Sequence, residues 1–209
     1  MDGRDRASFR DPSGFVFRRG GVLYRQVNPP YREDYDHLMS SGLYEALASD
    51  GLLVAHVERP SVPPHEPGAY RILQPDPVPF LSYPYEWCFG ALKAAALLTL
   101  EIQRRALAHE MVLKDASAYN VQFMGSRPLF IDTLSFARYQ PGRPWVAYRQ
   151  FCEHFLAPLL LISRVDPRLG RMQAVHLDGI PLDLASRLLP GRTWLRLSPL
   201  LHVHLHARA

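Results

Sequence analysis

Three polar residues within residues 112–136 have the types and the spacing that phosphoryl transfer requires. Asp115 is followed five positions later by Asn120, and Asp132 ends the apolar run that comes after a turn at residues 125–128. Phosphoryl transfer needs a carboxylate that orients the attacking hydroxyl and oxygen ligands that hold Mg²⁺ on the phosphates. An Asp-x-x-x-x-Asn loop with a later Asp supplies both.

The elements that would position these residues are a loop, a strand, a turn and a second strand. Two short apolar runs flank Gly125, which favours a strand pair. A plainer interpretation is that the three polar residues only cap strands and turns, as Asn and Asp often do. The spacing alone does not decide between the two, but the strand pair in this place favours the catalytic pattern.

Upstream, residues 15–27 form two β-rich segments around Arg19-Gly20-Gly21. The glycine pair supplies the positive φ that a tight turn needs, so we expect a β-hairpin. In a functional interpretation the glycines, Gly20 among them, and either Arg18 or Arg19 cover a bound phosphate. A hairpin with solvated arginines is the simpler alternative.

Helical spacing over residues 31–51 predicts one helix or two short helices interrupted at Gly42. Long runs of strong helix formers predict buried helices further on, one of them kinked at Pro158. The expected strands cover residues 52–57, 69–73 and 78–83, and the expected helices 89–109, 145–163, 167–176 and 181–189.

Three histidines recur at every second position near the end of the chain, at His202, His204 and His206. In a strand they would share one face, where a metal could bind. No acid or cysteine accompanies them, so we favour an incidental arrangement. Cys152 and His154 would point apart on a helix, which favours packing over a Cys-His catalytic pair.

The composition is that of a globular protein, with 47% hydrophobic and 21% charged residues. The longest apolar run is too short to span a bilayer, and the first residues are too charged for a signal peptide. Two cysteines do not make a disulfide framework, which fits a reducing compartment. We therefore expect a cytoplasmic protein without a membrane association.

The formal net charge of +4 comes from scattered basic residues, so a nucleic-acid surface is not indicated. Only Lys93 and Lys114 are lysines among the 24 basic residues. Any other site that requires a cation must therefore use arginine.

The order of these elements resembles the protein-kinase-like fold, and more closely its aminoglycoside-phosphotransferase branch. The resemblance covers residues 9–163 and implies an α+β, two-lobed protein. Residues 1–84 would form the β-rich lobe and residues 85–209 the mainly helical lobe. Matched to this family, Asp115 corresponds to the catalytic aspartate, and Asn120 and Asp132 to the metal ligands that would hold Mg-ATP.

The chain departs from an active kinase at several positions. It has no glycine-rich loop, and Thr133-Leu134 follows Asp132 where the family has Phe-Gly. The strand lysine that holds the phosphates is missing, because no lysine precedes position 93. Arg25 is the stand-in, and arginine is a wider, planar donor. Losing the lysine should weaken transition-state stabilisation.

The whole chain is also similar to the N-terminal region of bacterial proteins classed as class I S-adenosylmethionine-dependent methyltransferases. The segments that carry this similarity are SYPYEWCF, LKDASAYNVQF, FIDTLSF and GIPLDLASRLLP. No strand followed by a G-x-G loop is present, so we expect no S-adenosylmethionine site in this chain. The resemblance implies a methyltransferase domain or subunit as partner, outside this chain.

Three functions follow. The first is a kinase-like domain without catalytic activity that serves as the accessory or substrate-binding part of such a methyltransferase-type protein. The second is an active small-molecule phosphotransferase with Asp115 as base and Mg²⁺ on Asn120 and Asp132. The third is a basic nucleic-acid or substrate-recognition module.

Overall fold

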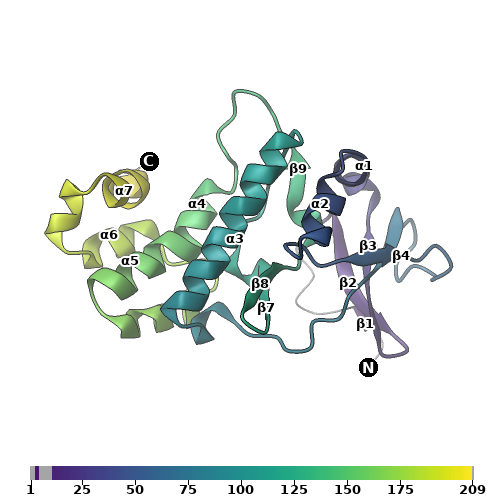
Figure 1. Cartoon of the computed structure of the whole chain (residues 1–209), viewed down its shortest axis with the longest axis horizontal. Helices are drawn as coiled ribbons and strands as arrows, with labels where there is room; N and C mark the ends of the chain where they lie inside the picture. The colour runs from purple at the N-terminus through teal and green to yellow at the C-terminus, as the bar shows by residue number, and fades with distance from the viewer. Residues whose placement is uncertain (1–2, 5–10, 209) are drawn as a thin grey trace.

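The computed structural model describes residues 3, 4 and 11–208, and it combines α-helices with antiparallel β-sheets. Figure 1 shows a five-stranded sheet at one end, helices at the other, and α3 with two small sheets between them. The sheet has the order β1-β2-β3-β5-β4. Its strands are β1 (Gly3–Arg4), β2 (Gly14–Arg19), β3 (Val22–Val27), β4 (His56–Glu58) and β5 (Arg71–Pro75). Most of the N-terminal charges that argued against a signal peptide lie outside the described residues. The same is true of residue 9, where the resemblance to the kinase-like fold begins.

The expected hairpin is confirmed as β2 and β3. Arg19 pairs with Val22, so the turn holds only Gly20 and Gly21. Both glycines have positive φ, 56° and 78°. Two successive positive φ values match the right-handed twist of the strands, and glycine adopts them without steric cost.

The next segment is a pair of short helices, as the sequence predicts. Helix α1 (Arg32–Ser40) and helix α2 (Leu43–Ser49) are separated at Gly42, whose φ of 79° is left-handed. Tyr35 and Leu38 of α1 and Leu47 of α2 are buried. The left-handed residue turns the chain so that both helices bury one face.

The predicted strand over residues 52–57 is wrong in its extent. Leu53 makes only a single parallel bridge to Phe130, and the strand proper is β4. Phe130 is the last residue of β8. The bridge therefore connects the segment before β4 to the strand pair that precedes Asp132.

The predicted buried strand over residues 78–83 is also wrong. This segment is extended but unpaired, and Phe80 is 74% exposed. Pro79 within the segment, and Pro77 just before it, have no N–H to donate to a neighbouring strand. Instead the amide of Gln122 anchors the segment, because its Oε1 accepts from Ser82 N–H at 2.9 Å and its Nε2 donates to the Ser82 carbonyl at 3.0 Å.

Helix α3 (Phe89–Ala108) runs through the middle of the molecule (Figure 1). The helix buries one face along its whole length, because Leu92 and Ile102 are fully buried whereas Leu97 and Leu100 are exposed. The expectation that its first half is buried on all sides is therefore wrong. Two small antiparallel sheets pack near it. They consist of β6 (Met111–Leu113) with β9 (Phe136–Arg138), and β7 (Val121–Met124) with β8 (Arg127–Phe130).

The helix expected over residues 145–163 consists of α4 (Tyr148–Phe151), a π-helical turn (Cys152–Leu156) and α5 (Ala157–Arg164). Pro158 explains the irregularity, because it has no N–H to bond the preceding turn. The freed carbonyls find other partners. The Glu153 carbonyl accepts from Ile180 N–H at 3.0 Å, and the His154 carbonyl accepts from the Gln173 side chain at 3.2 Å.

In the last part of the chain, all the regular elements that the structure describes are helical, and short turns connect them. Its elements are a 3-10 helix (Pro167–Ala174), α6 (Leu182–Leu188), a second 3-10 helix (Gly191–Leu195), α7 (Leu197–Pro199), a π-helical turn (Leu200–Leu205) and a terminal 3-10 turn (His206–Arg208). The two predicted helices at 167–176 and 181–189 are therefore confirmed.

The strand considered for the three terminal histidines is wrong, because they lie in the π-helical and 3-10 turns. His204 is fully buried, and its ring nitrogens lie 2.7 Å from Ser186 Oγ and 2.8 Å from Thr193 Oγ1. His202 and His206 both contact Tyr148. Within the described residues no three His, Cys, Asp or Glu side chains are placed to share a metal ion.

The largest hydrophobic cluster takes residues from both sides of residue 84. It joins α1 and α2 to α3, to the small sheets and to α4 with its π-helical turn. A second cluster lies among the C-terminal helices, around Leu161, Ile180 and Val203. Both cysteines are free. None of the described helices has the length and apolarity needed to cross a membrane.

Candidate functional site

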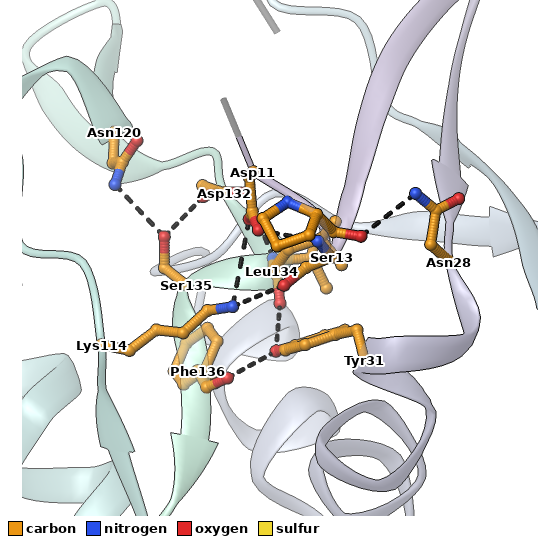
Figure 2. A network of polar contacts seen from close by, with 12 residues as sticks. Asp11, Ser13, Asn28, Tyr31, Lys114, Asn120, Asp132, Leu134, Ser135 and Phe136 are labelled. Atoms are coloured by element: carbon orange, nitrogen blue, oxygen red, sulfur yellow. Dashed lines mark hydrogen bonds and ion pairs between the residues drawn. The ribbon is translucent and has the colours of Figure 1, made fainter. Parts of the chain in front are cut away.

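Asp132 lies two residues after the end of β8 and caps the N-terminus of the 3-10 helix Thr133–Ser135. Its Oδ1 accepts a hydrogen bond from Leu134 N–H at 3.2 Å, and its Oδ2 accepts one from Ser135 Oγ at 2.5 Å. A carboxylate that receives local backbone and hydroxyl donors stabilises a tight turn. Figure 2 shows this turn facing the end of the large sheet.

Arg25, in the middle of β3, donates from Nη1 to Asp132 Oδ1 and forms an ion pair with it. Both side chains are largely buried, at 18% and 17% exposure. Burial by itself would raise the pKa of Asp132. The Arg25 guanidinium, the Ser135 hydroxyl and the Leu134 N–H outweigh it, so the pKa lies below its usual value and the carboxylate stays charged.

Asn120 joins this group through Ser135. Its Nδ2 donates to Ser135 Oγ at 3.2 Å, and that hydroxyl in turn donates to Asp132 (Figure 2). The backbone holds the same arrangement, because the Asn120 carbonyl accepts from Ile131 N–H at 2.8 Å. Arg25, Asp132 and Asn120, from three separate parts of the sequence, therefore form one polar network.

Asp115 lies beside this network but has different partners. Its Oδ1 accepts from Ser117 N–H at 2.9 Å and from Gln150 Nε2 at 2.8 Å. The preceding residue, Lys114, ties the loop to the network because its N–H donates to the Ser135 carbonyl at 2.7 Å. Gln150, in α4, therefore holds the loop that carries the predicted catalytic carboxylate.

His154 belongs to the surroundings of Asp115. It is 4% exposed, and its ring meets the Tyr119 ring edge to face. Burial lowers its pKa to about 4, although the charges of Asp115 and Asp178 act in the opposite direction. The imidazole is therefore neutral at neutral pH.

Lys114 and Tyr31 connect the candidate site to the N-terminal part of the chain, on the side of the large sheet. Lys114 Nζ donates to Ser13 Oγ at 2.7 Å, lies 3.9 Å from Asp11 Oδ2, and stands 4.7 Å above the Tyr31 ring (Figure 2). Tyr31 is 1% exposed, and its hydroxyl lies 2.8 Å from the Phe136 carbonyl and 3.2 Å from that of Thr133. These contacts fasten the Asp132 turn to the N-terminal half.

Arg19 and Gly20 are not part of this network. They lie at the hairpin turn, three residue pairs along the strands from Arg25, which is about 10 Å. Arg19 bonds the carbonyls of Pro63 and Pro64 in the proline-rich loop. The structure thus brings Arg25 to Asp132 and places the two other residues predicted to bind phosphate elsewhere.

Sequence reasoning missed Ser135, Tyr31 and Gln150. A signal existed for Ser135, since a hydroxyl three residues after an Asp often completes a turn. Tyr31 and Gln150 gave no local signal. Tyr31 lies 102 positions from Thr133, and Gln150 lies 35 positions from Asp115, so only the folded chain shows the contacts.

The arrangement bears directly on metal binding. Asn120 Oδ1 accepts no hydrogen bond from a described residue, so it could serve as a ligand. Both Asp132 oxygens, in contrast, already accept donors, and one of these is a full positive charge. A cation at Asp132 would lie beside the Arg25 guanidinium, and the two positive charges would repel each other. The residues present fit an internal ion pair better than a magnesium site.

Comparison with known proteins shows an extended similarity to a curated protein. The chain is 38% identical over 208 residues to the nodulation protein NoeA of Rhizobium meliloti (strain 1021). The similar region covers 99% of this chain and 43% of NoeA. The chain thus spans less than half the length of the curated relative it matches. No family model matches the chain.

Proposed function

We propose that this chain is a two-lobed, protein-kinase-like domain without catalytic activity, and that it serves as the accessory or substrate-binding part of a methyltransferase-type protein. The observation that carries the proposal is the Arg25–Asp132 ion pair. Arg25 stands at the position that the resemblance assigns to the phosphate-binding lysine, and Asp132 at that of the metal ligand. The two neutralise each other instead of facing a nucleotide.

The length comparison supports the accessory role. The matched region is less than half of NoeA, so NoeA has a further part that is longer than the region matched by this chain. In the proposal that part is the methyltransferase-type domain, present in the same polypeptide or in a partner subunit. A role in the process for which NoeA is named, nodulation, is part of the same proposal.

Calorimetric titration with Mg·ATP tests the loss of nucleotide binding. We expect no binding heat for the wild type and none for Asp132→Ala. Arg25→Lys is measured beside the wild type, because it keeps the positive charge at this position but replaces the guanidinium with the ammonium group of an active kinase. Saturable heat from the wild type that disappears in Asp132→Ala would refute the proposal.

The alternative is an active small-molecule phosphotransferase that uses Mg-ATP. One observation favours it: Arg25, Asp132 and Asn120 meet in one network, and Asp115 lies at its edge. An assay of ATP consumption with Asp115→Asn separates the alternatives. A wild-type rate that Asp115→Asn abolishes would establish catalysis, whereas equal background rates support the accessory domain.

The accessory role has its own test. We expect a methyltransferase-type sequence in the same or the adjacent reading frame, and we expect its product to elute together with this chain in gel filtration. Separate elution of the two purified proteins would contradict the partnership without bearing on nucleotide binding.

A further inference from the structure

Three arginines surround a hollow at the C-terminal end of the molecule, near α5 and α7 in Figure 1. Arg164 ends α5, Arg192 lies in the 3-10 helix Gly191–Leu195, and Arg196 follows that helix. The hollow has a volume of about 290 Å³. Its walls also include Leu160, Thr193, Leu197, Ser198 and Pro199.

Within the described residues, none of the three guanidinium groups forms an ion pair or a hydrogen bond, although the Arg196 backbone bonds Thr193 and Leu200. The same region contains arginines that do, since Arg168 pairs with Asp166 and Arg187 pairs with Asp183. These pairs use two of the three acids after residue 163, and no acid lines the hollow. Three guanidinium groups therefore face one hollow without a carboxylate to balance them.

The distribution of charge along the chain leads to the same place. Residues 1–163 contain seventeen basic and seventeen acidic residues, whereas residues 164–209 contain seven arginines and three aspartates. The whole net charge of +4 therefore arises in the C-terminal segment. Arginine keeps its charge in proteins, and all three arginines are exposed, so an anion from solution can reach them and would reduce their mutual repulsion.

The chemistry of the lining defines the anion. Guanidinium groups bind phosphate through paired N–H donors, and several of them can surround one phosphate group. The neighbouring wall is apolar, with Leu197 at 72% exposure, and Leu195 beside the hollow is 90% exposed. A ligand with an apolar group next to its phosphate would cover these side chains.

We propose that this hollow binds the phosphate group of a phosphate ester that carries an apolar substituent. The site lies among the C-terminal helices and shares no residue with the Arg25–Asp132 network. It is therefore independent of the proposed function. Two sources supply such a ligand, a soluble phosphate ester and the headgroup of an anionic phospholipid.

Calorimetric titration of the full chain with inorganic phosphate and with octyl phosphate tests the proposal. We expect saturable binding of both, tighter for octyl phosphate because its chain covers the leucines. Arg192→Gln and Arg196→Gln should each weaken binding about tenfold, as the loss of one charge-assisted hydrogen bond implies. Leu197→Ala should weaken only octyl phosphate.

Arg187→Gln is the matched control, because it removes the same charge from the same region but outside the hollow. Sedimentation with phosphatidylcholine vesicles, with and without phosphatidic acid, separates the two sources. Binding to phosphatidic acid vesicles that Leu195→Ser abolishes identifies a lipid headgroup, and binding of octyl phosphate alone identifies a soluble ester. The proposal is overturned if none of the probes binds saturably. It is also overturned if Arg187→Gln and Arg192→Gln weaken the binding of the phosphate probes equally.

Discussion

Arg25 of β3 and Asp132, which follows β8, form a largely buried ion pair across 107 positions of sequence. The pair connects the large N-terminal sheet to the turn that carries the candidate site. Asp132 also caps its own turn, so the same carboxylate serves a local and a long-range contact. The site is therefore part of what holds the two halves together.

Removing one partner of this pair should destabilise the fold. Arg25→Met leaves a largely buried carboxylate without its cation, and we expect the free energy of unfolding to fall by about 3 kcal/mol. Asp132→Asn keeps a turn acceptor and should cost a similar amount. The double variant should lose less than the sum, which urea denaturation of all four proteins measures. Additive losses would mean that the two side chains do not interact.

Tyr31 directly precedes α1, and its buried hydroxyl offers a test of the contact between this part of the chain and the Asp132 turn. Tyr31→Phe removes the donor to the Phe136 and Thr133 carbonyls while keeping the ring. We expect a loss of about 1–2 kcal/mol, since a buried carbonyl is left without its partner. Tyr139→Phe, at a residue 39% exposed, is the control and should change stability little. Equal effects of the two changes would contradict the role of Tyr31.

Gly14 at the start of β2 has no space for a side chain. A Cβ there would lie 2.1 Å from the Gln26 carbonyl oxygen and 2.7 Å from a methyl of Leu134. Gly14→Ala must therefore shift backbone, and we expect a loss of more than about 2 kcal/mol by thermal or urea unfolding. Gly191→Ala meets no atom within 4 Å and should be nearly neutral. A stable Gly14→Ala protein would show that the strand is placed differently.

His154 predicts a loss of stability in mild acid. Burial lowers its pKa to about 4, whereas the unfolded chain has a value near 6.5. The unfolded state therefore binds more protons between these values. Stability is complete above about pH 6.5 and falls as the pH drops to about 4, by up to about 3 kcal/mol for this residue.

Urea denaturation at pH 7.5 and pH 5.0 measures the effect. His154→Asn should reduce the difference between the two pH values, even if it lowers stability at both. His56 will leave a residual dependence, because burial and the nearby Arg25 also lower its pKa to about 4. An unchanged pH dependence in His154→Asn would show that this histidine is not buried in its neutral form.

Local patterns determined the elements whose geometry is encoded over a few residues. Gly20-Gly21 sets the hairpin turn, Gly42 separates α1 from α2, and Pro158 disturbs the long helix. Each acts through the φ values or the donors of its own neighbours. The sequence therefore predicted these features correctly, together with α3 and the strand pair that precedes Asp132.

Patterns that depend on pairing with distant strands misled the prediction. The apolar residues 78–83 match a strand, but the prolines before them and the absence of a partner edge leave the segment unpaired. The alternating histidines match one face of a strand, but helical packing sends His204 into the core and His202 to Tyr148. The periodicity of residue types in a segment cannot by itself show which other element the segment will pack against.

The sequence by itself determined the residue types of the candidate site, namely the polar residues Asp115, Asn120 and Asp132 and the arginine Arg25. Only the tertiary structure decided that Arg25 neutralises Asp132 and that Arg19 lies at the far turn. The physical reason is that an ion pair between residues 107 positions apart depends on how the sheet packs against the Asp132 turn. That packing is a property of the whole core, and no local stretch of the chain encodes it.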